Sequence, residues 1–387
     1  MLDDRLEFPR GFAAHTAPLG LRESGDDFAV VFSRTPASSA GVFTRSLFAG
    51  PSVTLSRARA NSGRARAIAV VAKNANVANG DQGLRDAAEL SVLVGSGIGV
   101  DHEEVVVAST GVIGRPYPMA RIRSGLATLH SAPFESGPTD VAKAMMTTDT
   151  VLKVSEQTVG NARVVGVAKG VGMIEPDMAT MLAFVFTDAE AEPALLDRLW
   201  RRAADETFNC LSVDTDTSTS DTAVVLANGA AGPVSEAKLG VALREVCRDL
   251  TIQLARDGEG ATKLITVTAS GASDDRQARR VAKAVVNSPL VKTAVHGADP
   301  NWGRVAMAIG KCYEEPGIDP DRVEIYFGDL QAYPARPGPQ GLAALATVMK
   351  ADHVDITVEL ADGEATATVY GCDLSAGYVH INADYTT

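Results

Sequence analysis

The sequence predicts a layered α+β fold, an α/β sandwich. Three features support this prediction: short β-branched stretches typical of strands, longer stretches with helical spacing, and a hairpin-type turn near the C-terminus. This mixture favours α+β layers over a doubly wound parallel sheet. Apolar residues make up 45% of the 387 residues and aromatic residues only 5%, so we expect a core of Ala, Val, Leu and Ile.

Strands and helices are mixed along the first two thirds of the chain. Strands are predicted where short β-branched segments are bounded by turn residues, at 28–35, 67–72 and 105–108. Helices are predicted where Leu, Ala and Met recur at helical spacing, at 81–94, 117–130 and 139–146. Further along we expect helices at 193–207 and 235–257, a strand at 223–227, and Gly258 as a helix C-cap.

The pattern changes in the C-terminal part of the chain. A predicted strand at 263–269 and a helix at 277–295 precede three segments that alternate with period two, at 323–327, 354–360 and 364–370. The last two are joined by Ala361-Asp-Gly, which predicts a β-hairpin. We therefore expect a main domain over residues 1–280 and a smaller C-terminal domain over residues 281–387.

Composition excludes several classes of partner and compartment. A net charge of −12 without a Lys and Arg cluster argues against a nucleic-acid partner. The four cysteines lie far apart and form no Cys-x-x-Cys pair, which is typical of reduced thiols in a cytoplasmic protein. The N-terminus, MLDDRLEFPRGF, lacks the apolar core of a signal peptide, and no run approaches the ~18 apolar residues of a membrane span. We expect a cytoplasmic protein without a membrane partner.

Two segments imitate ligand-binding loops but fail in detail. Asp214-Thr-Asp-Thr-Ser218 resembles the start of a calcium loop, yet Thr219 stands where that loop requires Gly. Gly95-Ser-Gly-Ile-Gly99 resembles a dinucleotide fingerprint, yet Val100 stands where the third Gly belongs. The six histidines show no ligand spacing. We predict neither a metal nor a cofactor.

The segment Lys169–Thr180 precedes an apolar stretch, Met181–Phe186, and places Thr180 at the start of a predicted strand, directly after Ala179. A self-cleaving precursor presents its nucleophile in this way. The Thr180 hydroxyl would attack the Ala179 carbonyl, and the released α-amine would then act as the general base of that hydroxyl. By itself a Thr that opens a strand is more often an ordinary strand residue.

Several segments together resemble one family. The segment Lys169–Thr180 resembles the signature of the ornithine acetyltransferase (glutamate N-acetyltransferase) family, and six other segments are similar to that family in the same order. They are Ala108–Gly114, Met146–Thr150, Asp214–Thr222, Asp257–Gly260, Asp299–Arg304 and Asn382–Thr387. The resemblance implies sheets between helical layers, a catalytic domain processed into two fragments, and a smaller C-terminal domain.

The resemblance also implies roles for individual residues. Thr180 would be the nucleophile after cleavage between Ala179 and Thr180, and Thr110 and Gly111 would form the oxyanion hole. Substrate would be bound by Thr147, Lys169, Thr180, Glu259, Asn382 and Thr387. Without the resemblance, Lys169 is typical of a solvated surface residue and Glu259 of a turn carboxylate.

The implied reaction moves an acetyl group from N2-acetylornithine to glutamate through acetyl-Thr180, without a cofactor. Acetyl-CoA remains open as a further donor. The two fragments would stay associated, as a heterotetramer or another homo-oligomer of the processed unit. Three alternatives remain open: a self-processing aminopeptidase or amidase, a processed binding protein without turnover, and a secondary-metabolism paralogue that acts on a related N-acyl amino acid.

Overall fold

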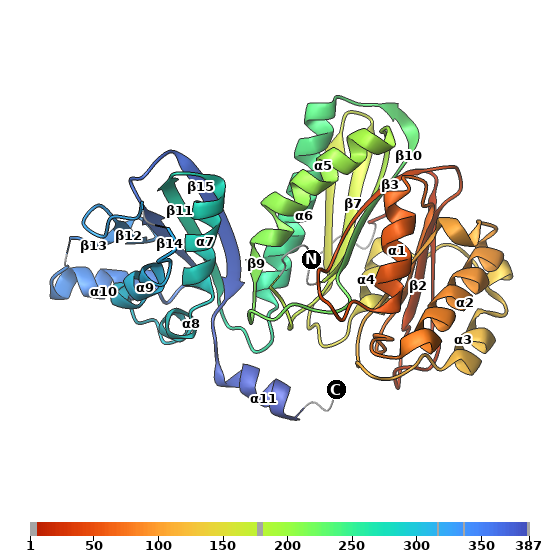
Figure 1. The fold of residues 1–387 in the computed structure, drawn as a ribbon, viewed down its shortest axis with the longest axis horizontal. Coiled ribbons are helices and arrows are strands. Elements are labelled where there is room, and N and C mark those ends of the chain that lie inside the picture. Colours follow the sequence, from red (N-terminus) through yellow and green to blue (C-terminus); the bar gives the residue numbers. More distant parts are fainter. Residues whose placement is uncertain (1–5, 176–180, 316, 336, 385–387) are drawn as a thin grey trace.

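The computed structural model describes residues 6–175, 181–315, 317–335 and 337–384. Within these residues the strands form sheets of four, five and six strands, with helices packed on their faces (Figure 1). The predicted α+β layering is confirmed. The predicted Ala179–Thr180 cleavage site and Thr387 lie outside the described residues.

The first sheet has the strand order β1-β2-β4-β5 and is antiparallel except for the β4–β5 pair. Its strands are β1 (Phe12–Ala17), β2 (Phe28–Ser33), β4 (Ala67–Val71) and β5 (Val105–Ser109). Helices α2 (Gly80–Ile98) and α3 (Met119–Leu126) cover one face, because Leu90, Val94 and Ile122 pack among the strand residues.

The second sheet has the order β3-β10-β8-β7-β6. Its strands are β3 (Ser38–Phe43), β6 (Lys153–Val159), β7 (Ala162–Lys169), β8 (Leu182–Glu190) and β10 (Thr222–Pro233). Alternation along β8 sends Ala183 and Val185 toward helices α5 (Pro193–Glu206) and α6 (Glu236–Arg256). Phe184 and Phe186 point the other way, toward the first sheet and helices α1 (Pro51–Asn61) and α4 (Pro138–Met145). The two sheets thus share one apolar layer.

The third sheet has the order β13-β12-β14-β11-β15-β9. Its strands are β9 (Leu211–Ser212), β11 (Leu264–Ala272), β12 (Glu324–Phe327), β13 (Leu330–Tyr333), β14 (His353–Glu359) and β15 (Ala365–Cys372). Its helices are α7 (Asp275–Val286), α8 (Pro289–His296), α9 (Trp302–Gly310) and α10 (Pro339–Val348). The last helix, α11 (Ala376–Asp384), runs from this sheet back toward the rest of the molecule (Figure 1).

Most predicted elements are found in the structure, while others were not predicted from the sequence. The missed elements include β1, β3, β6, β7, α1, α9, α10 and α11. Two predicted helix ends were wrong. The helix expected at 277–295 is divided into α7 and α8, since Ser288 caps a new helix that begins at Pro289. Asp257, rather than Gly258, occupies the C-cap of α6.

The predicted hairpin of the two last strands is also wrong. β14 and β15 do not pair with each other, because β11 lies between them and pairs with both. The turn explains this arrangement. The backbone N–H groups of Leu360 and Asp362 donate to Ser270 and Gly271 at the end of β11, so the chain crosses over that strand instead of folding back beside β14.

The third sheet begins upstream of the predicted domain boundary, because β11 and the start of α7 precede residue 280. The division into residues 1–280 and 281–387 stays a prediction. No helix in the described parts of the chain combines the length and apolar character that crossing a membrane requires.

We predict that Trp200→Ala destabilises the protein by about 3–5 kcal/mol, as large-to-small changes in cores do. Trp200 is fully buried on α5, contacts Phe208 edge-on, and donates from Nε1 to the Ala223 carbonyl at 3.2 Å. Urea denaturation monitored by circular dichroism would measure the loss. Val241→Ala on the exposed side of α6 is the control and should remain within about 0.5 kcal/mol of wild type. Equal effects of the two changes would contradict this core assignment.

Candidate active site

A cavity lies where the ends of the first two sheets meet the loop after α6 and the helix α11. It brings together six of the residues predicted from the sequence: Thr110, Gly111, Thr147, Lys169, Glu259 and Asn382. Met181, which directly follows the predicted nucleophile Thr180, also lines it. The remaining predicted residues, Ala179, Thr180 and Thr387, lie outside the described part of the chain.

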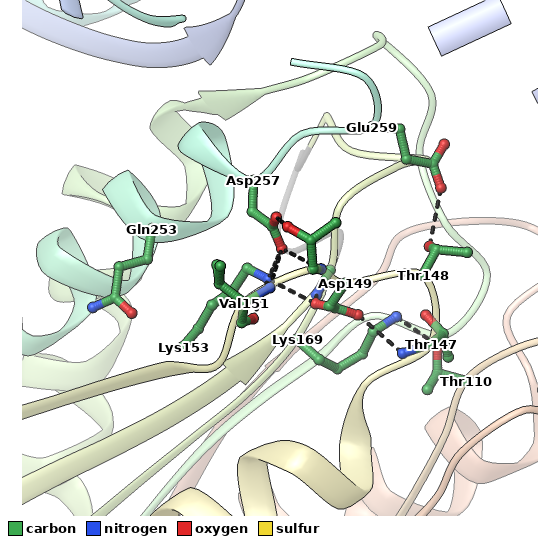
Figure 2. A network of polar contacts seen from close by, with 12 residues as sticks. Thr110, Thr147, Thr148, Asp149, Val151, Lys153, Lys169, Gln253, Asp257 and Glu259 are labelled. Carbon is green, nitrogen blue, oxygen red and sulfur yellow. Dashed lines mark hydrogen bonds and ion pairs between the residues drawn. The ribbon is translucent and has the colours of Figure 1, made fainter. Parts of the chain in front are cut away.

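Lys169 is a buried lysine at the end of β7, not the solvated residue that its type alone suggests. Its Nζ donates to Oγ1 of Thr110 at 2.9 Å (Figure 2). Burial lowers the pKa of Lys169, while the nearby carboxylate of Asp149 acts in the opposite direction. The lysine therefore reaches the cavity with a polar partner and a carboxylate close by.

The turn after β5 presents two different donors. The backbone N–H of Thr110 is already used, because it donates to the Val71 carbonyl at 3.1 Å. The Thr110 N–H is therefore paired within the fold, while its hydroxyl contacts Lys169 Nζ. The assignment of Thr110 to the oxyanion hole stays a prediction. Gly111 has φ +132°, and a Cβ there would lie 2.2 Å from the Lys73 carbonyl carbon, so the position requires glycine. Its N–H has no hydrogen-bond partner among the described residues.

Glu259 lies across the cavity and is held by both of its oxygens. Thr148 Oγ1 donates to Oε1 at 3.0 Å, and Asn382 Nδ2 donates to Oε2 at 2.9 Å. The Glu259 backbone N–H donates to Val171 at 2.8 Å. A side chain at Gly172 would displace the carboxylate, since a Cβ there would lie 2.4 Å from Oε2. The cavity thus has the Lys169 amine on one side and the Glu259 carboxyl group on the other.

A buried ion network supports this arrangement from behind (Figure 2). Lys153 Nζ contacts Asp149 at 2.8 Å and Asp257 at 2.6 Å, and all three side chains are almost completely buried. Asp149 also accepts hydrogen bonds from the backbone N–H groups of Thr147 at 3.0 Å and Gly170 at 2.7 Å. One carboxylate therefore holds the two loops that carry Thr147 and Lys169.

A model of the ArgJ family matches residues 13–387. The chain belongs to the ArgJ family. The family resemblance inferred from the sequence is confirmed.

Relatives of the family cover the chain almost completely. An arginine biosynthesis bifunctional protein ArgJ 2 from Nostoc sp. is 54% identical over 98% of both chains. A glutamate N-acetyltransferase Oat2 from Streptomyces clavuligerus is 53% identical over 100% of both chains. A crystal structure of the arginine biosynthesis bifunctional protein argJ from Bacillus halodurans matches with a TM-score of 0.50 and 43% identity, and covers 53% of this chain and 100% of that chain.

The site of this ArgJ-family chain includes residues that the sequence analysis missed. Lys73 Nζ donates to the Thr147 carbonyl at 2.6 Å, and burial together with Arg22 and Lys169 lowers the pKa of Lys73. A positive φ of 70° at this lysine is unusual and was not visible in the sequence. Asp149 carried a signal, because it lies within the Thr-Thr-Asp-Thr segment that marks the family.

Within the described residues, no group of three or more His, Cys, Asp or Glu side chains is arranged so that it could hold a metal ion. The four cysteines are buried as free thiols. Burial raises the pKa of the thiols of Cys210, Cys312 and Cys372, the last to about 11. These thiols therefore remain protonated at neutral pH.

We predict that Asp149 makes stability depend on acid pH. Burial alone would raise the pKa of Asp149, but Lys169 and Lys153 outweigh that effect and lower it to about 2. A carboxyl whose pKa is lower in the folded state stabilises the fold above its unfolded pKa of ~3.9, and the effect is lost as the pH falls toward 2. Asp149→Asn should therefore destabilise the protein at pH 7, and its deficit should shrink between pH 4 and pH 2.

Urea denaturation at a series of pH values would measure this deficit. Asp197→Asn is the control, because Asp197 forms an ion pair with Arg201 that is exposed to solvent. The control should show little change at any pH. A deficit of Asp149→Asn that is constant from pH 7 to pH 2 would exclude the assigned ionisation.

Proposed function

We propose that the chain is a glutamate N-acetyltransferase that moves the acetyl group of N2-acetyl-L-ornithine to L-glutamate through acetyl-Thr180. The observation that carries this proposal is the cavity itself. It unites the Thr110–Gly111 turn, Lys169 and Glu259 beside Met181, the residue after Thr180. Membership of the ArgJ family over residues 13–387 supports the same reaction.

The charges of the cavity suit amino-acid substrates. Ornithine and glutamate each carry a carboxylate, and the ammonium group of Lys169 offers it an opposite charge in a buried position. The amino groups of both substrates have a matching carboxylate in Glu259, which Thr148 and Asn382 hold in place. We assign substrate binding to Thr147, Lys169, Glu259 and Asn382, and to Thr180 and Thr387 from the sequence.

Activation requires cleavage between Ala179 and Thr180. The Thr180 hydroxyl oxygen attacks the Ala179 carbonyl carbon, and the C–N bond breaks as the nitrogen accepts a proton. Water then hydrolyses the ester that has formed. The upstream fragment ends in a carboxylate, and Thr180 keeps its hydroxyl and gains a free α-amine.

Acetyl transfer then proceeds in two half-reactions. The α-amine of Thr180 takes the proton of its own hydroxyl as the oxygen attacks the acetyl carbon of acetylornithine. Negative charge develops on the acetyl oxygen, where the Thr110 hydroxyl and the Gly111 N–H can donate. Ornithine leaves as its nitrogen accepts the proton. The amine of glutamate then attacks acetyl-Thr180 and releases N-acetylglutamate together with the free hydroxyl.

The partners follow from this reaction. We propose acetylornithine and glutamate as substrates, with acetyl-CoA as the alternative donor, and stable association of the two fragments in a cytoplasmic homo-oligomer such as a heterotetramer of both fragments. Two alternative enzyme classes remain. One is an aminopeptidase or amidase, and the other is a secondary-metabolism enzyme that acts on another N-acyl amino acid. Release of acetate without glutamate, or a preference for another acyl acceptor, would favour these alternatives.

We predict that the purified protein consists of two fragments. Its intact mass under denaturing conditions should show one species that ends at Ala179 and one that begins at Thr180. Thr180→Ala should give a single inactive chain, because the attacking hydroxyl is removed. Thr180→Ser keeps a hydroxyl and should still be cleaved. A single full-length mass for the wild type would refute the N-terminal nucleophile.

We also predict that the Thr110 hydroxyl stabilises the oxyanion of the transition state. Thr110→Val removes the hydroxyl that contacts Lys169, and kcat for acetyl transfer from acetylornithine to glutamate should fall by about 100- to 1,000-fold. Thr110→Ser retains the hydroxyl and is the matched control, with a loss of less than about tenfold. The KM values should change little if the contact forms only in the transition state. An unchanged kcat in Thr110→Val would remove Thr110 from the mechanism.

A further inference from the structure

Glu175 is the last described residue before the predicted cleavage segment. Its side chain does not line the cavity and instead contacts the third sheet and its helix α7. Its Oε2 accepts a hydrogen bond from Asn287 Nδ2 at 2.6 Å and from Ser212 Oγ at 3.2 Å. Its Oε1 lies 3.5 Å from Lys283 Nζ, and both side chains of this ion pair are about 80% buried. Ser212 lies in β9 of the third sheet, Lys283 lies in α7, and Asn287 is the C-cap residue of α7.

The backbone around Glu175 is fixed as well. The Glu175 N–H donates to Asp216 at 2.9 Å, and its carbonyl accepts from Thr217 Oγ1 at 3.1 Å. Immediately upstream, the carboxylate of Asp214 accepts the N–H groups of Met173 at 2.6 Å and Ile174 at 2.7 Å. The polypeptide therefore enters the cleavage segment from one defined position.

The polypeptide leaves the cleavage segment from a defined position too. The buried Met181 lies just ahead of β8, and its carbonyl accepts the Thr222 N–H at 3.0 Å. Five residues thus join two fixed points, Glu175 and Met181. Attack of a hydroxyl on the preceding carbonyl needs the reacting atoms about 3–3.5 Å apart, so restricting both ends of so short a segment favours the reaction.

We propose that Glu175 is a positioning residue for self-cleavage, acting through its contacts with Ser212, Lys283 and Asn287. This inference rests on the proposed function, since it presupposes cleavage between Ala179 and Thr180. Every side-chain partner of Glu175 follows residue 180 in the chain. The same contacts therefore hold the end of the upstream fragment against the downstream fragment after the break.

The chain provides a matched control, a second carboxylate that contacts the same helix, α7. Asp205 of α5 also reaches α7, where it forms a bidentate ion pair with Arg279 at 2.8 and 2.9 Å. Arg279 lies one helical turn before Lys283. Asp205 is remote in sequence from the cleavage segment and is no part of the catalytic cavity. Its loss should weaken the attachment of α7 while the hydrogen bonds of Glu175 to Asn287 and Ser212 remain.

The experiment follows cleavage in a cell-free synthesis of the full chain, with samples quenched in acid and measured by intact mass. Glu175→Ala should slow cleavage by about 10- to 100-fold. Asp205→Ala should cleave at the wild-type rate. Glu175→Gln keeps an acceptor for Asn287 and Ser212 and should cleave faster than Glu175→Ala, and Asn287→Ala should slow cleavage from the opposite side of the contact.

The outcomes separate the two proposals. A wild-type chain that is never cleaved refutes the processing step, and the role of Glu175 with it. A wild-type chain that is cleaved while Glu175→Ala keeps its rate overturns only the inference. Equal slowing in Glu175→Ala and Asp205→Ala also overturns it, because attachment of α7 would then explain the effect. If Glu175→Ala does not fold, the rates of Glu175→Gln and Asn287→Ala decide in the same way.

Discussion

The buried carboxylate of Asp149 is the group on which the site depends. It lies between Lys153 and the region of Lys169, and it accepts the backbone N–H groups of Thr147 and Gly170. Removing one member of a buried charged group costs about 3–5 kcal/mol, because the partner is left uncompensated. Such a network therefore keeps the segments around Thr147 and Gly170 in one arrangement. It also permits a second buried lysine, Lys169, to line the cavity.

The rest of the cavity is assembled from segments that are far apart in the sequence. The first sheet provides the Thr110–Gly111 turn at the end of β5, and the second sheet provides Lys169 and Met181 at the neighbouring ends of β7 and β8. These ends meet because the two sheets pack on a common layer of apolar residues. Glu259 follows the end of α6, whose C-cap Asp257 is held by the same lysine, Lys153.

The third sheet is connected to this site at more than one point. The short strand β9 follows α5 of the second sheet and pairs with β15 of the third sheet. The helix α11 follows the third sheet and places Asn382 in contact with Glu259. Glu175 adds a polar contact between the loop before the cleavage segment and α7. A chain that is to be cut in its middle needs such contacts, because the two fragments are afterwards held together only by noncovalent interactions.

The sequence by itself determined the layered α+β class and most helices and strands, and through the family resemblance it indicated six of the residues that line the cavity. Periodicity reports burial on one face of an element, and family segments report residue identity, so both are readable without coordinates. Only the tertiary structure decided which strands pair, that β11 separates β14 from β15, and that the Thr110 N–H pairs with Val71 while its hydroxyl contacts Lys169. It also revealed the contacts of Lys73, Lys153 and Glu175. These depend on packing between segments distant in sequence, and a lone Lys or Glu carries no local pattern that predicts its partner.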